Sequence, residues 1–533
     1  MKSRRLMLAA CAVGLLVMVA MQPQAVAQSE KTMSVAIGRI TTFNPITAAG
    51  GYEYAVFRLI WGGVAVPTPE AEIVPDQIEQ WSVSPDARTW TFTLRRGLKW
   101  SDGRPATAQD LVFTLTRALD RRTGSIWAGP LTIIEGAPAY VEGRAQTVSG
   151  IRQVDDLTVR VTLSDPNSAL FVSGMVTHRP LPILPAHILG NVPPGELARH
   201  AFWNKPDVTL GPFVFVRYQP DQFLEVRANP NYWGPKAQVD RMILRITPTV
   251  DAAVAQVERG EVQITNIPAL EAERLGKVAS LRILKAPGTA PIRITFDHTK
   301  PYFKDRRVRQ AFQQAIDREG LVKTVLQGYG LVPAHDILGP AWAKSDIKPY
   351  PFSPDRARAL LREAGWDPNR RVTLSLIPGF RDRDLAVTII QQQLRDVGVQ
   401  MDIRQQDLGT VLRGFIDRSF DMYLYGGGNF RLDPDFVCLL YCSENFYPSG
   451  ANLGHYSNER IDTLAGAGRR LGRTDLRARV YADLAKTIYD EVPNIWLYVA
   501  DTVYAVQRNV TGFVAHTNYE TMFWNGYAWG VSR

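Results

Sequence analysis

Aspartate, serine and histidine side chains could carry out hydrolysis, but this chain lacks the spacings that such chemistry requires. It has no G-x-S-x-G or H-E-x-x-H motif, no S-x-x-K in a suitable setting, and no P-loop or G-x-G-x-x-G. We therefore expect no enzyme activity, with an exported hydrolase of unrecognised motif as the alternative. The seven histidines do not cluster along the sequence, and we expect them to be structural: His178, His187, His200, His298, His335, His455 and His516.

Aromatic side chains are the more prominent feature, with 12 Trp, 19 Tyr and 21 Phe. Aromatic residues line many ligand clefts, although in a chain of 533 residues most of them belong to the core. The composition permits a binding cleft without placing one.

The first 27 residues have the composition of an export signal. Three basic residues precede an apolar run over 6–21, and Ala25-Val26-Ala27 has the small-x-small pattern of a cleavage site. A membrane anchor is the alternative, but the run is shorter than the ~20 residues that a span needs. We expect this segment to be removed and the mature protein to be exported.

Removal of the segment lowers the formal net charge from +9 to +6, because it carries three basic and no acidic residues. No run of Lys and Arg suggests a nucleic-acid surface. Cys438 and Cys442 are then the only cysteines, and in an oxidising compartment we expect a local disulfide between them. Two buried thiols are the alternative. Zinc is not expected, because no histidine lies nearby at ligand spacing.

The N-terminal third contains a strand, a turn and a helix in succession. TWTFTL, residues 89–94, alternates apolar and polar side chains as a half-buried strand does. After a turn at 101–105, Thr107 and Asp110 have capping-box spacing. A helix follows, with Leu111, Leu115 and Leu119 on one face. This unit is a scaffold that demands no catalytic group.

Later segments predict further sheet and an α/β region. Residues 213–217 and 223–228 are predicted to form a β-hairpin. From 305 the pattern becomes helical, and we expect Gly320 to separate two helices. Residues 372–377, 385–397 and 399–404 then predict a strand, a helix and a strand, which is a βαβ unit.

Longer stretches carry a resemblance to a known family. In chain order they are PDQIEQWSVSPDARTWTFTLRRGLKWSDGRPATAQDLVFTLTRAL (75–119), GPFVFVRYQPDQFLEVRANPNYWG (211–234), VERGEVQIT (257–265), FKDRRVRQAFQQAIDREGLVKTVLQGYG (303–330) and SPDRARALLREAG (353–365). With these blocks in the family's order, the chain resembles extracellular solute-binding family 5. That family comprises the large periplasmic peptide-, opine- and nickel-binding proteins of ABC importers.

The resemblance implies an α/β fold of the periplasmic binding protein type, class II or cluster C, with two lobes, a small inserted third domain and a hinged ligand cleft. Such proteins close two lobes around a solute without covalent chemistry, and the closed form is then read by a permease. The implied boundaries are a signal peptide at 1–27, lobe I at 28–70, 203–295 and 506–533, the inserted domain at 71–202, and lobe II at 296–505.

The resemblance also implies where a ligand's amine would bind. In peptide-binding relatives an acidic side chain meets the amine, because a buried charge must be paired. That acid lies near an Asp-Pro motif, which Asp433 begins here, but its own position falls on Asn429 or Phe430, and Arg431 adds a positive charge. We expect these residues to contact the ligand. Either Asp433 replaces the missing acid, or the ligand's amine is blocked or absent; Arg431 as a solvated loop residue is the alternative.

An arginine often meets the ligand's carboxylate in such relatives. Arg381 and then Arg383 are the candidates, in the segment GFRDRD between a predicted strand and a predicted helix. Ion pairs with Asp382 or Asp384 are the alternative for both arginines.

Two aromatic residues complete the implied site. Tyr52 lies in a segment, AAGGYEY, that lines the cleft in relatives, and Trp127 would be an aromatic wall from the inserted domain. Ordinary packing is the alternative for each. No metal and no cofactor are expected.

We therefore expect a monomeric solute-binding component that captures a peptide or peptide-like solute and delivers it to an inner-membrane ABC permease, with no nucleic-acid partner. An opine, a sugar or another non-peptide solute is the alternative within the family. A nickel chelate is least supported, because the Asp-Pro segment holds no histidine, although His455 lies downstream. A ligand-dependent partner of a sensor and a peptide-holding chaperone share the binding step and stay open.

Overall fold

The computed structural model describes residues 30–48, 50–171, 175, 181–427 and 432–532. All elements described below belong to one compact unit, Lys31–Arg533. The expected signal peptide lies outside the described residues, so its cleavage stays a prediction. Among the residues that are described, no helix is long and apolar enough to cross a membrane.

The largest sheet joins strands from distant parts of the chain. β1 pairs in parallel with β10 and β11, and β19 pairs antiparallel with β11 and β12. The predicted hairpin is confirmed as the antiparallel pair β8 and β9. We call this sheet with α1 (Gly51–Ile60), α7 (Val250–Glu258) and α8 (Ala272–Gly276) lobe I. The strand order is β12 (Leu281–Ala286), β19 (Thr502–Gln507), β11 (Ile264–Ile267), β1 (Thr32–Ile37), β10 (Arg241–Ile246), β9 (Phe223–Ala228) and β8 (Phe213–Gln219).

A six-stranded sheet forms the centre of what we call lobe II. The predicted βαβ unit is confirmed, because β15 and β16 pair in parallel on either side of α13 in the sequence. The chain leaves the lobe I sheet after β12 and returns to it after β18, so two segments join the sheets. The order is β14 (Gly330–Leu331), β18 (Asn494–Ala500), β13 (Ile292–Phe296), β17 (Met422–Gly426), β15 (Arg371–Leu376) and β16 (Gln400–Gln405).

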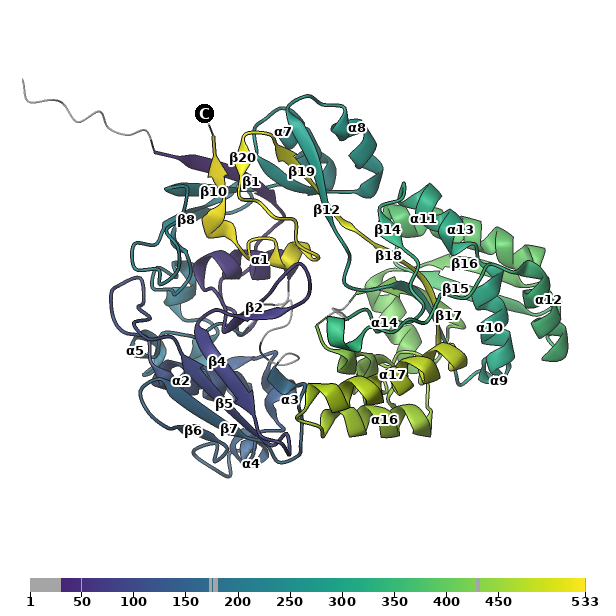
Figure 1. Ribbon diagram of the computed structural model, residues 1–533, viewed down its shortest axis with the longest axis horizontal. Helices are drawn as coiled ribbons and strands as arrows, with labels where there is room; N and C mark the ends of the chain where they lie inside the picture. Colours follow the sequence, from purple (N-terminus) through teal and green to yellow (C-terminus); the bar gives the residue numbers. More distant parts are fainter. Residues whose placement is uncertain (1–29, 49, 172–174, 176–180, 428–431, 533) are drawn as a thin grey trace, which may run out of the picture. The chain divides into compact units, whose positions relative to one another are not determined.

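Helices supply most of the remainder of lobe II (Figure 1). The helices α10, α11, α12 and α13 share one hydrophobic core with the sheet. The expected break at Gly320 is wrong. The break comes at Ile316, and Asp317 caps the next helix by accepting a hydrogen bond from the Gly320 N–H at 2.8 Å. The helices are α9 (Pro301–Lys304), α10 (Arg306–Ala315), α11 (Arg318–Val325), α12 (Pro354–Glu363), α13 (Arg381–Asp396), α14 (Leu408–Asp417), α15 (Cys438–Tyr441), α16 (Glu459–Arg469) and α17 (Thr474–Glu491).

A four-stranded sheet, β4 (Ile78–Val83), β5 (Thr89–Leu94), β7 (Thr158–Thr162) and β6 (Ile151–Gln153), lies between β3 and β8 in the sequence. β5 is the predicted alternating strand, and its three apolar residues are buried. The predicted capping box is present at α2 (Ala108–Leu119). The domain boundaries themselves stay a prediction. Shorter elements are β2 (Ala65–Pro67), β3 (Ile73–Pro75), α3 (Ala128–Leu131), α4 (Ala137–Val141), α5 (Ala186–Leu189), α6 (Pro194–Leu197), β20 (Val510–Thr511) and β21 (Gly530–Val531).

Three of the histidines are buried in separate parts of the fold. The Nε2 atoms of His298 and His516 lie 2.9 and 3.0 Å from the backbone oxygens of Pro493 and Pro67. Burial lowers the pKa of His298 to about 3, and the pKa values of His335 and His516 to about 4. These histidines are therefore neutral in the folded protein at pH 7.

We expect this burial to make the protein acid-sensitive. The folded pKa values lie below the unfolded value of about 6.5, so the unfolded chain takes up protons that the folded protein does not. The free energy of unfolding is therefore fully retained above pH 6.5 and decreases as the pH falls towards 4. At pH 5 each buried histidine lowers the free energy of unfolding by about 2 kcal/mol. His298→Gln should therefore reduce the pH dependence of urea unfolding between pH 7.5 and 5, whereas His200→Gln at a partly exposed position should not. An unchanged slope in His298→Gln would contradict the prediction.

Candidate functional site

The segment before Asp433 is only partly described. Asn429, Phe430 and Arg431 lie outside the described residues, so their expected contacts with a ligand stay predictions. Leu432, the first described residue after this segment, is 4% exposed. Asp433 then caps the short 3-10 helix Pro434–Val437, because its carboxylate accepts the N–H of Asp435 at 2.9 Å.

Asp433 already has a strong partner in the described chain. Nη2 of Arg477, on α17, lies 2.9 and 3.0 Å from the two carboxylate oxygens. Asp433 is 2% exposed and Arg477 6%. Burial acts to lower the pKa of Arg477, but the charge of Asp433, together with Tyr481 and the hydrogen bonds to both residues, holds that pKa above its ordinary value. The pair is thus neutral as a whole, and this carboxylate does not carry an uncompensated charge for a ligand's amine.

A second, partly buried pair lies beside the first. Nε of Arg469, at the end of α16, donates to both oxygens of Asp435 at 2.9 Å, and the Tyr481 hydroxyl donates to the same carboxylate at 3.1 Å. Burial raises the pKa of Asp435, against the charge of Arg469. Both acids of the DPD sequence therefore anchor this turn to α16 and α17.

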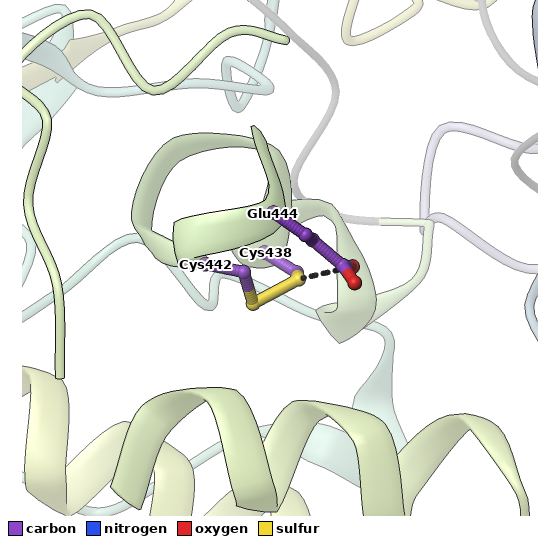
Figure 2. A group of neighbouring side chains, drawn as sticks. All are labelled: Cys438, Cys442 and Glu444. Carbon is purple, nitrogen blue, oxygen red and sulfur yellow. Dashed lines mark hydrogen bonds between the residues drawn. A yellow bond between two sulfur atoms is a disulfide. The ribbon is translucent and has the colours of Figure 1, made fainter. Parts of the chain in front are cut away.

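The cysteines follow directly on this turn (Figure 2). Cys438 and Cys442 are joined in a disulfide with their Cα atoms 4.7 Å apart, and both residues are buried. Glu444 points towards them, with Oε1 3.6 Å from the Cys438 sulfur. Among the described residues this is the one group of three candidate metal ligands. Metal coordination by cysteine needs thiolates, and the disulfide leaves none.

The two candidate arginines begin α13. Arg381 is exposed, and the Arg383 guanidinium lies 4.1 Å from the centre of the Phe380 ring. Nε of Arg383 is buried and has no hydrogen-bond partner among the described residues. An unsatisfied buried donor on a cation is costly unless a ligand or water completes it.

The two acidic residues next to these arginines accept hydrogen bonds from other residues. The Tyr498 hydroxyl donates to Asp382 at 3.0 Å, and the backbone N–H of Gly379 donates to Asp384 at 3.0 Å. Within the described chain, no carboxylate lies within 4.0 Å of Arg381 or Arg383, so the alternative of ion pairs with these acids has no support here.

The aromatic candidates lie in packed surroundings. The Tyr52 ring is 5.1 Å from that of Tyr519, and burial raises the pKa of Tyr52. Trp127 is 5% exposed, belongs to the main hydrophobic core and donates its indole N–H to the oxygen of Pro45 at 3.3 Å. Contact of either residue with a ligand stays a prediction.

The sequence analysis did not predict a buried polar cluster around Arg293. Arg293, on the central strand β13, lies 3.3 Å from Asp336, and both are fully buried. Arg293 also donates to the backbone oxygen of Gly427 at 3.2 Å, and its guanidinium lies 5.1 Å from the Tyr425 ring. Asp336 accepts hydrogen bonds from Trp496, at 2.6 Å, and from Tyr441. An arginine inside the apolar strand IRITF was the available signal, but nothing in the sequence pointed to its partner.

A cavity of about 540 Å³ adjoins Asp433. Ser168 ties its two sides together, because its N–H donates to Arg469 O at 2.8 Å and its hydroxyl to Gly468 O at 3.3 Å. One side comes from the four-stranded sheet and neighbouring segments, the other from lobe II. The lining residues are Ala71, Glu72, Ile73, Trp81, Ser82, Val83, Trp90, Ser168, Phe171, Pro340, Ala341, Trp342, Leu432, Asp433, Gly472, Thr474 and Arg477.

Comparisons with known proteins agree on a family. The model of the bacterial extracellular solute-binding proteins, family 5 (middle), matches residues 72–448. The dipeptide-binding protein of Escherichia coli is 26% identical over 520 residues, which are 93% of this chain and 94% of the relative.

Solved structures share the fold. The ABC transporter substrate-binding protein CtaP of Listeria monocytogenes has a TM-score of 0.82 and 22% identity, and the match covers 95% of this chain and all of that one. The oligopeptide-binding protein AppA of Bacillus subtilis, in complex with a nonapeptide, has a TM-score of 0.73 and 21% identity, with 95% and 100% coverage. The likeness confirms the predicted two-lobe α/β fold. Because the family model covers well over half of its length, this chain belongs to the bacterial extracellular solute-binding proteins, family 5.

Proposed function

We propose that the protein is the solute-binding component of an ABC importer, that it works in the periplasm, and that it delivers a peptide or peptide-like solute to a membrane permease. The observation that carries this proposal is the family match over 72–448, which includes strands of both connected sheets and the Asp433 turn. Relatives over nearly the full length are named for dipeptide and oligopeptide binding. The two connections between the sheets suit a hinge that closes around a solute.

The test is native mass spectrometry of the mature protein, followed by denaturation and identification of what is released. Released peptides, and intact trialanine recovered after long incubation with the protein, would support a binding protein. Cleaved trialanine would favour the exported hydrolase. A single non-peptide molecule would replace the peptide by another solute while leaving a transport role.

Within this function we propose that Arg383 binds the carboxylate of the solute. Its buried, unpartnered Nε and the absence of a nearby carboxylate in the described chain support this assignment. A hydrogen bond between charged groups is worth about 1.5–3 kcal/mol. Arg383→Ala should therefore weaken the binding of trialanine by about 10- to 100-fold in calorimetry.

Two matched comparisons make this test specific. Trialanine amide, which lacks the carboxylate, should bind the wild type about as weakly as trialanine binds Arg383→Ala, and the variant should not distinguish the two ligands. Arg381→Ala, two residues earlier at an exposed position, should have the smaller effect. A larger loss in Arg381→Ala would transfer the role to Arg381.

A further inference from the structure

The cavity beside Asp433 has an aromatic wall from the four-stranded sheet region. The Trp81 and Phe171 rings are 4.8 Å apart, and the Trp90 ring is 5.9 Å from Phe171. Trp342, from lobe II, lines the other side, with its ring 5.0 Å from the Arg477 guanidinium. The cavity volume of about 540 Å³ is within the range of about 300–1,000 Å³ that is typical of small-molecule sites.

The charges of this cavity cancel. Asp433 and Arg477 are the buried ionic groups in the lining, and they neutralise each other at 2.9 Å. Glu72 is exposed, so water screens its charge. A charged group entering this space would lose its hydration without gaining an opposite free charge, which is unfavourable. An uncharged group would not meet this cost.

The polar atoms that remain suit a neutral ligand. The Trp90 indole N–H already donates to the oxygen of Asn167 at 3.2 Å. The indole N–H groups of Trp81 and Trp342 donate to no described residue. They could each donate to a carbonyl or hydroxyl, while the rings offer apolar faces to an aromatic group.

We propose that this cavity is a subsite for an uncharged aromatic or large apolar side chain of the solute. The proposal rests on the proposed function. Leu432 and Asp433, at the turn that the family resemblance associates with the ligand, both line the cavity. The four-stranded sheet region thereby takes part in selecting the solute, together with lobe II.

The test uses the mature full-length protein and defined tripeptides. Trialanine is compared in native mass spectrometry with tripeptides that carry one Phe, one Lys or one Glu in place of each Ala in turn. Phe at one position should bind about 10- to 100-fold tighter than Ala, because burial of such a side chain is worth about that factor. Lys or Glu at that position should bind no tighter than Ala.

Variants then locate the effect. Trp342→Ala should reduce the preference for Phe over Ala to about 3-fold or less. Ser82→Trp, at an exposed lining position, should do the same by filling the cavity. Phe352→Ala removes an aromatic ring of lobe II that is 47% exposed and does not line the cavity, and it should keep the preference.

The outcomes separate the two proposals. If trialanine binds but Phe is not preferred, or if the preference persists in both Trp342→Ala and Ser82→Trp, the subsite is overturned and the transport function stands. If no tripeptide binds the wild type, the peptide-binding function is overturned, and the subsite with it.

Discussion

Replacement of Asp433 by alanine is expected to lower the free energy of unfolding of lobe II by about 3–5 kcal/mol, since removal of one partner leaves the other charge buried. Arg477 is 6% exposed and makes its ionic contact with Asp433 alone in the described chain. The variant also loses the acceptor that caps the turn at Pro434. Equilibrium urea unfolding, followed by tryptophan fluorescence, would measure the change.

A double variant separates the unpaired charge from other effects. Asp433→Ala with Arg477→Met removes both charges, and part of the lost stability should return, because buried ion pairs are often replaceable by apolar residues. Asp475→Ala, which breaks an exposed pair with Arg473, should change stability by less than about 1 kcal/mol. A small effect of Asp433→Ala, close to that of Asp475→Ala, would show that the pair with Arg477 is not intact in solution.

The same residue tests amine recognition. Asp433→Asn keeps the shape and an acceptor for the Asp435 N–H but removes the charge. We expect it to affect the binding of trialanine and of N-acetyl-trialanine equally, because the carboxylate is used by Arg477. A selective loss of the free-amine ligand would instead establish Asp433 as the replacement acid.

Local signals in the sequence predicted local structure well. The alternation in TWTFTL, the capping box of Thr107 and Asp110, and the βαβ order after residue 371 each depend on neighbours within a few residues, and all are present. The expected break at Gly320 failed because glycine is tolerated in the first turn of a helix, where Asp317 caps its N–H.

The candidate site was harder to predict because its partners are distant in the sequence. Arg477 lies 44 residues after Asp433, and the Arg293–Asp336 pair joins a strand to a later loop. Periodicity cannot match such groups. The family resemblance pointed to the Asp433 turn, but it could not show that the acid already has a partner.

Asp336→Ala is expected to be at least as damaging as Asp433→Ala, with a loss of about 3–5 kcal/mol or more. Asp336 is fully buried, and its removal takes away the carboxylate that lies 3.3 Å from the buried Arg293 guanidinium. It also removes the acceptor of the Trp496 N–H and the Tyr441 hydroxyl. Burial first, and the charge of Asp336 second, raise the pKa of Tyr441, so that hydroxyl keeps its proton and needs an acceptor.

The second expected consequence of Asp336→Ala is weaker ligand binding. Arg293 holds the backbone of Gly427, directly before the segment 428–431, so a displaced guanidinium would alter where that segment begins. We therefore expect trialanine to bind less tightly even at temperatures where the variant is folded, and Arg293→Lys, which keeps the charge but loses the guanidinium geometry, to show a smaller loss of both stability and affinity. Asp483→Ala, on an exposed face of α17, is the control for both measurements. Normal affinity in a folded but destabilised Asp336→Ala protein would limit the role of this buried pair to stability, because binding would then not depend on the position of Gly427.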